Sequence, residues 1–435
     1  MNTSWMKPVA VAVLASVFAS ACSGGGGDSK TEGPTAPAKP TELAPANIVI
    51  YSTSGWTEAA FNERFGDAIR KKFPQITFTY IQSAKGTTYP DLIASKQDID
   101  IIWESIGNFP RGPMTYGTHM DMTELMKLHS VDTSKIDAGM LDVIRKMGDG
   151  KLFAIPVINN TVITYYNKDI FDKFAIAYPK NDVTWDEVIE LNKRLTRTDG
   201  GIQYIGFAMS HFFATNSFSL PYANAQTKKP TITEPGWRSL YQVYARLAES
   251  DGYKEVVRKA NGVPAVNNFV KDKNVALLAS LANVHMNNDM TGINWDVVKF
   301  PTYKELPQTG PQAYPTYFGV SATSKFKDHG MEVIKFLISN DYQLEASKRG
   351  ILPAINTKEV KDVFAKDTPF SGKNVKISFY DKFAPVALRT IYDADVEKVY
   401  NTNIVKLMLG ETDLNTLLRQ AEEGAQKVIN ETATK

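Results

Sequence analysis

Cysteine is nearly absent from this sequence of 435 residues, which contains Cys22 and no other. No disulfide can therefore form within the chain. An excess of either charge is lacking as well, since 49 lysine and arginine residues are interspersed with 47 aspartate and glutamate residues. Without a basic patch or an acidic tail, we expect neither nucleic acid nor a strongly charged macromolecule as the partner.

Sequence motifs of enzymes and metal sites are also missing. The histidines are not spaced as in an HExxH metal site, and there is no G-x-S-x-G nucleophile turn. Four consecutive glycines, Gly24–Gly27, follow no expected strand and open no expected helix, so they do not form a phosphate-binding loop. We therefore expect no metal, no cofactor and no catalytic residue. The histidines are His119, His129, His211, His285 and His329.

A glycoside hydrolase stays open as an alternative function, because such an enzyme needs only two carboxylates placed across a cleft. The sequence offers Asp98, Asp100 and Glu104. These residues alternate along one expected strand and its end, which is weak evidence for a pair that faces each other across a cleft.

Residues 1–21 have the layout of a secretory signal peptide, with one lysine, an apolar run over residues 9–18 and small residues up to Ala21. The apolar run is too short to cross a membrane comfortably. Ala19–Cys22 resembles a bacterial lipobox, in which Cys22 becomes the lipidated first residue, and two or more acyl chains would hold the protein on a membrane. We favour this lipoprotein interpretation over a plain signal peptide, which would leave a secreted protein with a free thiol.

Residues 22–46 are rich in glycine and then in proline, and they contain almost no large apolar residue, so we expect a flexible tether. The length of the remaining chain favours two lobes. Expected strands at Ile48–Tyr51, Ile76–Ile81 and Ile99–Trp103 alternate with expected helices. This alternation predicts an α/β fold with parallel strands and with ligands bound beyond their carboxyl ends.

The stretch Lys151–Phe174, KLFAIPVINNTVITYYNKDIFDKF, is typical of a strand, a polar crossover, a second strand and a helix. It continues to VTWDEVIELNKRLT, where Thr184 and Glu187 predict a capping box. These two pieces are preceded by DIDIIWES and followed by WDVVKFP, YFGVSATSKFKDHGMEVIKFLIS and GILPAI. In this order they resemble the family-1 extracellular solute-binding proteins of the sugar-transporter type, the group that includes maltose-binding protein. The resemblance covers most of the chain.

The resemblance implies an α/β, two-lobed periplasmic-binding-protein type II fold with a hinge between the lobes. The chain would cross between the lobes near Val157–Asn160 and again near Tyr314. The first lobe would comprise residues 47–157 and 314–350, and the second lobe residues 158–313 and 351–435.

The same resemblance implies a function in which no bond is broken. A ligand would bridge both lobes and favour the closed state, which a transporter recognises. We expect a monomeric substrate-binding protein of an ABC importer that captures a carbohydrate, preferably an oligosaccharide, and delivers it to the permease subunits. Its expected place is the outer face of the bacterial cytoplasmic membrane, where Cys22 would anchor it. A ligand sensor of the same fold that does not transport is a further alternative.

Candidate ligand contacts in the first lobe follow two of the expected strands. Sugars present hydroxyl pairs and apolar ring faces, so their sites combine amides or carboxylates with aromatic planes. By their position in the family motif, Trp103 and Glu104 face the cleft; alternatively, Trp103 covers the sheet core and Glu104 is a solvated surface charge. Ser54 and Trp56 follow the first strand, and Trp56 suits the cleft and helix packing equally. On this interpretation, Trp103→Ala weakens ligand binding with little loss of the fold.

Further candidates lie in the crossing segment and in the loop SHFFATNSF of the second lobe. Asn160 aligns with a family position that often carries an acidic ligand contact, and an amide keeps the hydrogen bonding without the charge. The loop supplies His211, Phe212 and Asn216, which correspond to sugar contacts in relatives. A lone histidine beside two phenylalanines is nevertheless more often structural than functional.

The segment LLASLAN departs from the family pattern, because it lacks the usual glycine and aromatic residue. Asn283 stands near the missing aromatic, and this departure leaves the class of ligand open. Tyr380 is the last candidate, at a position where a stacking aromatic enters from the C-terminal helices of relatives. We assign the tryptophans at 185, 237 and 295 to packing.

Overall fold

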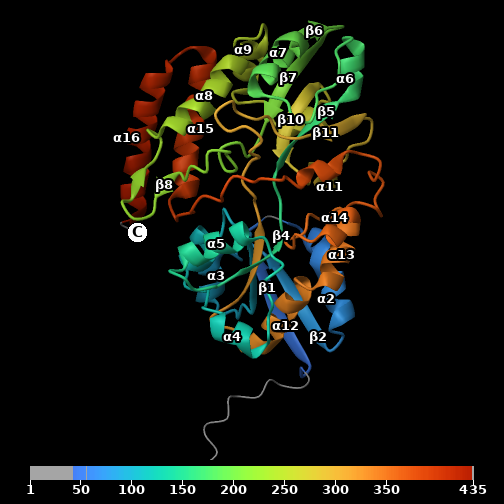
Figure 1. Cartoon of the computed structure of the whole chain (residues 1–435). Helices are drawn as coiled ribbons and strands as arrows, with labels where there is room; N and C mark the ends of the chain where they lie inside the picture. The colour runs from blue at the N-terminus through green and yellow to red at the C-terminus, as the bar shows by residue number, and fades with distance from the viewer. Residues whose placement is uncertain (1–42, 55, 434–435) are drawn as a thin grey trace, which may run out of the picture. The chain divides into compact units, whose positions relative to one another are not determined.

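The computed structural model describes residues 43–54 and 56–433. The predicted signal peptide, the predicted lipidation site Cys22 and most of the predicted tether lie outside these residues. The described chain contains two five-stranded sheets, each with its own hydrophobic core. We use these sheets and cores to define a first and a second lobe (Figure 1).

The first lobe is built on a mixed sheet with the strand order β2-β1-β3-β12-β4. Strand β1 pairs in parallel with β2 and β3, whereas β12 runs antiparallel to β3 and β4. Strand β12 is distant from the other four in sequence. All strands of the second sheet lie between β4 and β12 along the chain. The strands are β1 (Ala46–Ser52), β2 (Ile76–Gln82), β3 (Ile101–Ser105), β4 (Ile155–Ile158) and β12 (Thr316–Val320).

Helices pack on this sheet through apolar side chains that recur on one helical face. Phe61, Phe65 and Ile69 show the pattern, and all three are fully buried in the first core. The Thr57 side chain accepts a hydrogen bond from the Ala60 N–H and so caps this helical segment. The elements are α1 (Glu58–Phe61), the π-helical turn η1 (Asn62–Gly66), α2 (Asp67–Lys72), α3 (Tyr89–Ala94), η2 (Pro110–Met114), α4 (Thr123–Leu128), α5 (Ala138–Met147), α12 (Lys327–Leu337), α13 (Asn340–Lys348) and α14 (Lys358–Asp362).

The second lobe contains the sheet β11-β5-β10-β7-β6. Strand β10 is parallel to β7 and antiparallel to β5, and β5 is also antiparallel to β11. The predicted strand Val275–Leu281 agrees with β10 at both ends. The strands are β5 (Val162–Asn167), β6 (Arg197–Asp199), β7 (Ile202–Met209), β10 (Val275–Leu281) and β11 (Trp295–Val298), beside the short pair β8 (Ala223–Asn224) and β9 (Lys229–Pro230).

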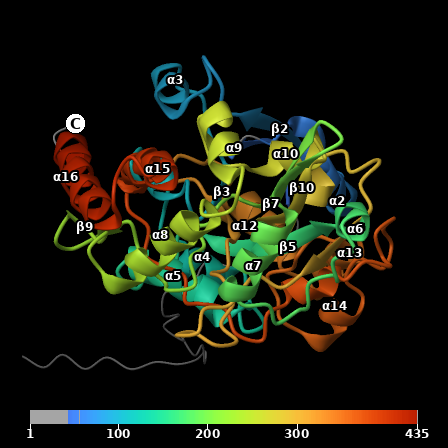
Figure 2. The ribbon, with the colours of Figure 1, turned by 90° about the horizontal axis from the view of Figure 1, so that it is seen from above.

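The C-terminal helices α15 and α16 pack against each other and against α8 (Figures 1 and 2). The capping box predicted for α7 is confirmed, since Thr184 and Glu187 exchange side-chain and backbone hydrogen bonds. The tryptophans at 185, 237 and 295 are buried in the second core, as predicted. The elements are α6 (Lys168–Lys173), α7 (Trp185–Leu195), α8 (Pro235–Leu247), α9 (Tyr253–Ala260), α10 (Val266–Val270), α11 (Val284–Asn287), η3 (Val375–Ser378), α15 (Asp393–Leu409) and α16 (Leu414–Ala433).

The segments that connect the lobes are hydrogen-bonded to one another. Strand β4 belongs to the first sheet and β5 to the second, so residues 159–161 form one crossing. The Tyr314 N–H donates to the Asn160 carbonyl at 2.7 Å, and the Asn159 N–H donates to the Leu352 carbonyl at 2.8 Å. Three segments far apart in sequence therefore lie side by side at the hinge.

The first core extends past Gly350, where the sequence suggested a change of lobe. Ile351, Ile355 and Val360 all belong to the first core. The reason is an isolated bridge between Ile355 and Ile136, which holds this segment beside the loop that precedes α5.

Candidate functional site

A pocket between the lobes contains three of the predicted ligand contacts, Trp56, Asn160 and Asn283. We call it the Trp56 pocket. The first lobe and the second lobe both contribute to its walls, and the free space between them is only about 30 Å³. A sugar ring cannot enter so small a space unless the lobes move apart. The lining residues are Trp56, Arg64, Ile158, Asn159, Asn160, Ala282, Asn283, Met286, Thr316, Gly350, Ile351, Leu352 and Phe364.

Arg64 in η1 is a buried cation in the wall of this pocket, with 3 % of its surface exposed. Its guanidinium lies 4.3 Å from the centroid of the Trp56 ring, within the range of a cation–π contact. Its Nη2 donates to Oδ1 of Asn287 in α11 at 2.6 Å. Because η1 belongs to the first lobe and α11 to the second, this hydrogen bond joins the two lobes.

The two predicted amides of the pocket have hydrogen-bonding capacity to spare. Oδ1 of Asn160 accepts from the N–H groups of Thr161 at 2.9 Å and of Ala282 at 3.1 Å. Its Nδ2 donates to no other residue of the described chain, and the Asn283 side chain makes no hydrogen bond to a described residue. Together they offer donors and acceptors beside the face of Trp56, which is the chemistry that a hydroxylated ring requires.

His285 lies in the same short helix as the residues that face the pocket. Its Nδ1 is 2.9 Å from the Tyr165 hydroxyl, and its ring stacks on Trp295. Burial lowers the pKa of His285 from 6.5 to about 4, so the imidazole is neutral at neutral pH. Its contacts hold α11, and with it Asn283 and Asn287, against the second core.

Trp103 belongs to the first core and does not face a cleft. It is 0 % exposed and packs against the rings of Phe61, Phe65 and Phe318. Strand β3 is covered on both faces, so both of its alternating sets of side chains are buried. The prediction that Trp103 contacts the ligand does not agree with this position, whereas the alternative of a core residue does.

Glu104 is buried next to Trp103 and is neither a surface charge nor a group open to a ligand. Its two carboxylate oxygens accept hydrogen bonds from the N–H of Thr53 at 2.7 Å and from the Thr53 hydroxyl at 2.8 Å. Burial raises the pKa of Glu104 to about 8, and the bonds from Thr53 partly oppose that rise. Glu104 therefore fixes the loop after β1, the loop that carries Ser54 and Trp56. Within this loop the Ser54 hydroxyl accepts a hydrogen bond from Ser52 at 2.8 Å.

The polar groups of Asn216 and Tyr380 are used inside the second lobe. Nδ2 of Asn216 donates to the carbonyls of Phe213 and Leu220, which closes a turn of the loop. The Tyr380 hydroxyl donates to the Val162 carbonyl at 2.9 Å. These bonds explain why both side chains are buried. Tyr380 still borders a cavity between the lobes, so its contact with a ligand stays a prediction.

Phe212 is buried as well, against aromatic rings of the second core that include Trp185 and Tyr244. It also borders the groove that His211 lines, so its contact with a ligand stays a prediction.

His211, in contrast, is exposed and lines a groove of about 800 Å³ in the second lobe, between α15 and the loop after β7. We call it the His211 groove. The His211 ring centroid is 6.2 Å from that of Tyr314. The Tyr314 hydroxyl approaches Gly107 of the first lobe so closely that a Cβ there would lie 2.5 Å from it. Tyr314 thus forms a second place where the lobes meet.

Charged residues at the start of α15 stand near this second contact. Arg389 and Asp393 are both buried, with 3.8 Å between Nη1 and Oδ2. Nε of Arg389 and Oδ2 of Asp393 have no hydrogen-bond partner among the described residues. Arg111 of η2 lies 3.7 Å from Asp395 and adds an ion pair between the lobes.

The carboxylates considered for a hydrolase are engaged inside the first lobe. Asp100 accepts hydrogen bonds from the Val49 N–H and the Ser324 hydroxyl. Asp98 pairs with Lys325 at 2.9 Å. Among the described residues, no three side chains of the types that bind metal ions are grouped to hold one. No helix in the same part of the chain has the length and apolar character needed to cross a membrane.

The sequence pattern of a bacterial protein family matches residues 59–370, which is most of the chain, and the family is described as bacterial extracellular solute-binding protein. This protein is a bacterial extracellular solute-binding protein. A curated relative, a binding protein of Brucella abortus strain 2308, is 22 % identical to this solute-binding protein over 300 residues. The match covers 65 % of this chain and 69 % of the relative.

Solved structures confirm the two-lobed fold. An ABC substrate-binding protein of Listeria monocytogenes in complex with cycloalternan is 21 % identical, with a TM-score of 0.69 over 88 % of this chain and 99 % of that chain. A sugar transporter of Rhizobium etli in an open conformation is 20 % identical, with a TM-score of 0.67 over 87 % and 99 %. The cyclic α-maltosyl-1,6-maltose binding protein of Arthrobacter globiformis is 15 % identical, with a TM-score of 0.65 over 89 % and 99 %.

Sequence reasoning missed Arg64 and the cluster around Tyr314 in this solute-binding protein. A signal for Arg64 was present, because it follows Phe61 by three residues and so falls near the buried face of its helix. Asp393 begins the long helix α15, and Arg389 lies four residues before it in the preceding segment. That spacing predicts a pair, but it does not show that the pair lies near the other lobe.

Replacing Trp103 by alanine tests its place in the core. We expect the free energy of unfolding to fall by about 3–5 kcal/mol, because the change leaves a large cavity. Urea denaturation measures the loss, and Trp56→Ala is the comparison, since Trp56 is only half-buried and should cost less. An unchanged denaturation midpoint for Trp103→Ala would contradict the core position.

Replacing Glu104 by glutamine tests its raised pKa. A carboxyl with a folded pKa of about 8 and an unfolded pKa near 4.5 stabilises the fold fully below pH 4.5. That contribution is lost as the pH rises through 8. Glutamine does not ionise; its oxygen accepts from the Thr53 N–H, and its Nε2 donates to the Thr53 hydroxyl. Its advantage over the wild type should therefore grow from pH 4.5 to 8 and reach the order of a few kcal/mol.

Thermal unfolding across this pH range measures the difference between Glu104→Gln and the wild type. The control is Glu124→Gln, which removes an exposed carboxylate and should follow the wild type throughout. A Glu104→Gln variant that also follows the wild type at every pH would show that Glu104 ionises normally.

Proposed function

We propose that this protein captures a carbohydrate, preferably an oligosaccharide, between its lobes and delivers it to the permease of an ABC importer. The observation that supports this best is the Trp56 pocket, where an aromatic ring stands beside the free Nδ2 group of Asn160 and the Asn283 amide. Structural neighbours fit the proposal, because their names state binding of cycloalternan, mannotriose and cyclic maltosyl-maltose.

The polar groups of the Trp56 pocket favour a neutral ligand. The cation Arg64 already contacts the Trp56 ring and Asn287, and the carboxyl of Glu104 is buried against Thr53. The groups left over are amides, which bind hydroxyls as donors and as acceptors. A cationic ligand would find no carboxylate in this lining, and an anionic ligand would have to compete with Asn287 for Arg64, whereas a sugar would find hydrogen bonds beside an aromatic ring.

Closure of the lobes is the step that this geometry supports. The Arg64–Asn287 hydrogen bond and the Arg111–Asp395 ion pair both join the lobes, so both contribute to the closed arrangement and not to an open one. They stabilise closure only in part, since Arg111 is about half exposed and its ion pair is screened by water. A ligand that contacts both walls of the Trp56 pocket adds the remaining free energy.

The setting of the protein follows from the family and from the sequence. As an extracellular solute-binding protein it acts outside the cytoplasm. We propose further that Cys22 carries a lipid anchor on the outer face of the cytoplasmic membrane. The protein would work there as a non-enzymatic monomer and meet the permease when its lobes are closed.

Sugar binding is tested by a thermal-shift screen with mono- and oligosaccharides and with amino acids and polyamines as controls. A ligand bound only by the folded state raises the melting temperature. For the sugar that gives the largest shift, we expect Asn283→Ala and Trp56→Ala to weaken binding at least tenfold in calorimetry, or about 1.4 kcal/mol.

The matched control is Tyr178→Ala, which removes an exposed aromatic ring from the second lobe and should leave the affinity unchanged. Stabilisation by amino acids or polyamines and not by any sugar would reject the carbohydrate. Equal affinities of the wild type and both pocket variants would reject the Trp56 pocket.

The lipid anchor is tested by labelling cells with radioactive palmitate. The wild type should carry the label and sediment with membranes, and Cys22→Ser should lose both properties, since no other cysteine is present to take the acyl group. An unlabelled wild type, or a Cys22→Ser variant with unchanged location, would contradict the anchor.

A further inference from the structure

A larger cavity of about 460 Å³ adjoins the Trp56 pocket and shares Asn159 and Leu352 with it. We call it the Asn159 pocket. Its walls are α5 of the first lobe, the segment 352–356 and the segment 378–386. Its volume falls in the range of small-molecule sites. None of the roles proposed above involves this cavity.

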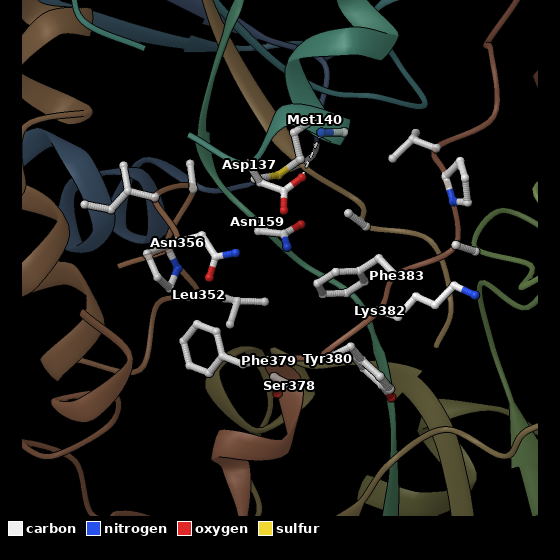
Figure 3. A pocket seen from close by; sticks show the side chains of 18 of the residues that line it. Asp137, Met140, Asn159, Leu352, Asn356, Ser378, Phe379, Tyr380, Lys382 and Phe383 are labelled. Atoms are coloured by element: carbon white, nitrogen blue, oxygen red, sulfur yellow. Dashed lines mark hydrogen bonds between the residues drawn. The ribbon is translucent and has the colours of Figure 1, made fainter. Parts of the chain in front are cut away.

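The Asn159 pocket combines aromatic rings with a few polar groups. Figure 3 shows the Phe383 ring and the Leu352 side chain bordering the same space as the side chains of Asp137 and Asn159. Phe379 and Met140 complete the apolar part of the lining. Sugar-binding sites combine flat apolar faces with amides or carboxylates, and this cavity contains both.

Asn159 is the residue that singles this cavity out. It is 9 % exposed, and its Oδ1 accepts a hydrogen bond from the Asn160 N–H at 2.8 Å. Its Nδ2 donates to no other residue of the described chain, although it borders the cavity. This free N–H₂ group is open to the cavity, so an acceptor on a molecule bound there can take a hydrogen bond from it.

The charges around the cavity balance. Three carboxylates and three ammonium groups lie in its lining, so no net field favours an anion or a cation. The Lys361 ammonium group also lies 5.8 Å from the centroid of the Phe379 ring, within the range of a cation–π contact. The balance favours a neutral molecule. The charged residues are Asp137, Asp142, Asp381, Lys146, Lys361 and Lys382.

We propose that the Asn159 pocket is a second ligand site, which binds a neutral polyhydroxylated molecule of mono- to disaccharide size. The Asn159 amide would donate to a ring or hydroxyl oxygen, the Asp137 carboxylate would accept from a hydroxyl, and Phe383 would cover an apolar ring face. The proposal can be tested apart from the ligand of the Trp56 pocket, because Asp137 and Phe383 line the Asn159 pocket and not the Trp56 pocket.

Ligand binding here is coupled to the arrangement of the lobes. Met140 of α5 packs with Ala313 and Ala354 in a small cluster, against which Phe383 also lies. Helix α5 belongs to the first core, whereas the neighbouring Tyr380 belongs to the second. The shape of the cavity therefore changes when the lobes rotate, and its ligand prefers one arrangement. Such coupling typically alters the affinity at the other site by about 5–150-fold, in either direction.

Two methionines make the two sites separately observable. Met140 lines the Asn159 pocket and Met286 lines the Trp56 pocket. In protein labelled with ¹³C-methyl methionine, the Met140→Leu and Met286→Leu variants assign the two signals. We would titrate glucose, mannose, trehalose, sucrose, maltose and mannobiose, and we expect at least one of them to shift the Met140 signal in a saturable way.

Two variants decide where the responding sugar binds. Phe383→Ala removes the aromatic wall and should abolish the Met140 response. Asp137→Asn should weaken it at least tenfold, and asparagine still caps α5 through the Gly139 N–H that Asp137 holds. Neither residue lines the Trp56 pocket, so the Met286 response should persist in both variants.

The outcomes separate this proposal from the function proposed above. A Met140 response without a Met286 response would support the second site and contradict sugar binding in the Trp56 pocket. A Met286 response alone, no response of either signal, or a Met140 response unchanged in Phe383→Ala would overturn the second site.

Discussion

The hydrogen bonds of Asn160 hold together the segments on which both lobes depend. Its carbonyl accepts from Tyr314, and its side-chain oxygen accepts from Thr161 and from Ala282. Thr161 lies in the same crossing as Asn160, Tyr314 lies in the crossing before β12, and Ala282 follows the last residue of β10. Because the bonds join segments near the hinge and not the two cores, the lobes can rotate without disturbing either core. An amide suits this position, since its oxygen accepts two N–H groups without the cost of burying a charge.

Much of the fold could be predicted from local sequence. The box of Thr184 and Glu187 and the strand Val275–Leu281 depend on neighbouring residues alone, and both agree with the structure. The alternation of strands and helices predicts the α/β class for the same reason. The helix α5 was not predicted, and the first core reaches beyond Gly350 because of a contact with Ile136, which is distant in sequence.

The site was predicted less well, because it depends on which faces are covered. Trp103 and Glu104 stand at the end of a strand, as a ligand contact would, but helices cover both faces of β3. A period-two pattern cannot show this, since every residue of a doubly covered strand is buried. Asn160 and Asn283 line the Trp56 pocket, and their positions relative to the family motif were the signal that singled them out. Arg64 was missed because its two partners, Trp56 and Asn287, come from separate parts of the chain.

This extracellular solute-binding protein meets the pH of its surroundings directly, and two groups near the site, one buried and one partly buried, respond to that pH in opposite directions. The carboxyl of Glu104, with its pKa of about 8, makes the fold less stable as the pH rises from about 4.5 to 8. The imidazole of His285, with its pKa of about 4, makes it less stable as the medium becomes acidic below 6.5. Between about pH 4.5 and 6.5 the two slopes oppose each other. The pair therefore acts as a compensator that flattens the dependence of stability on the acidity of the surroundings.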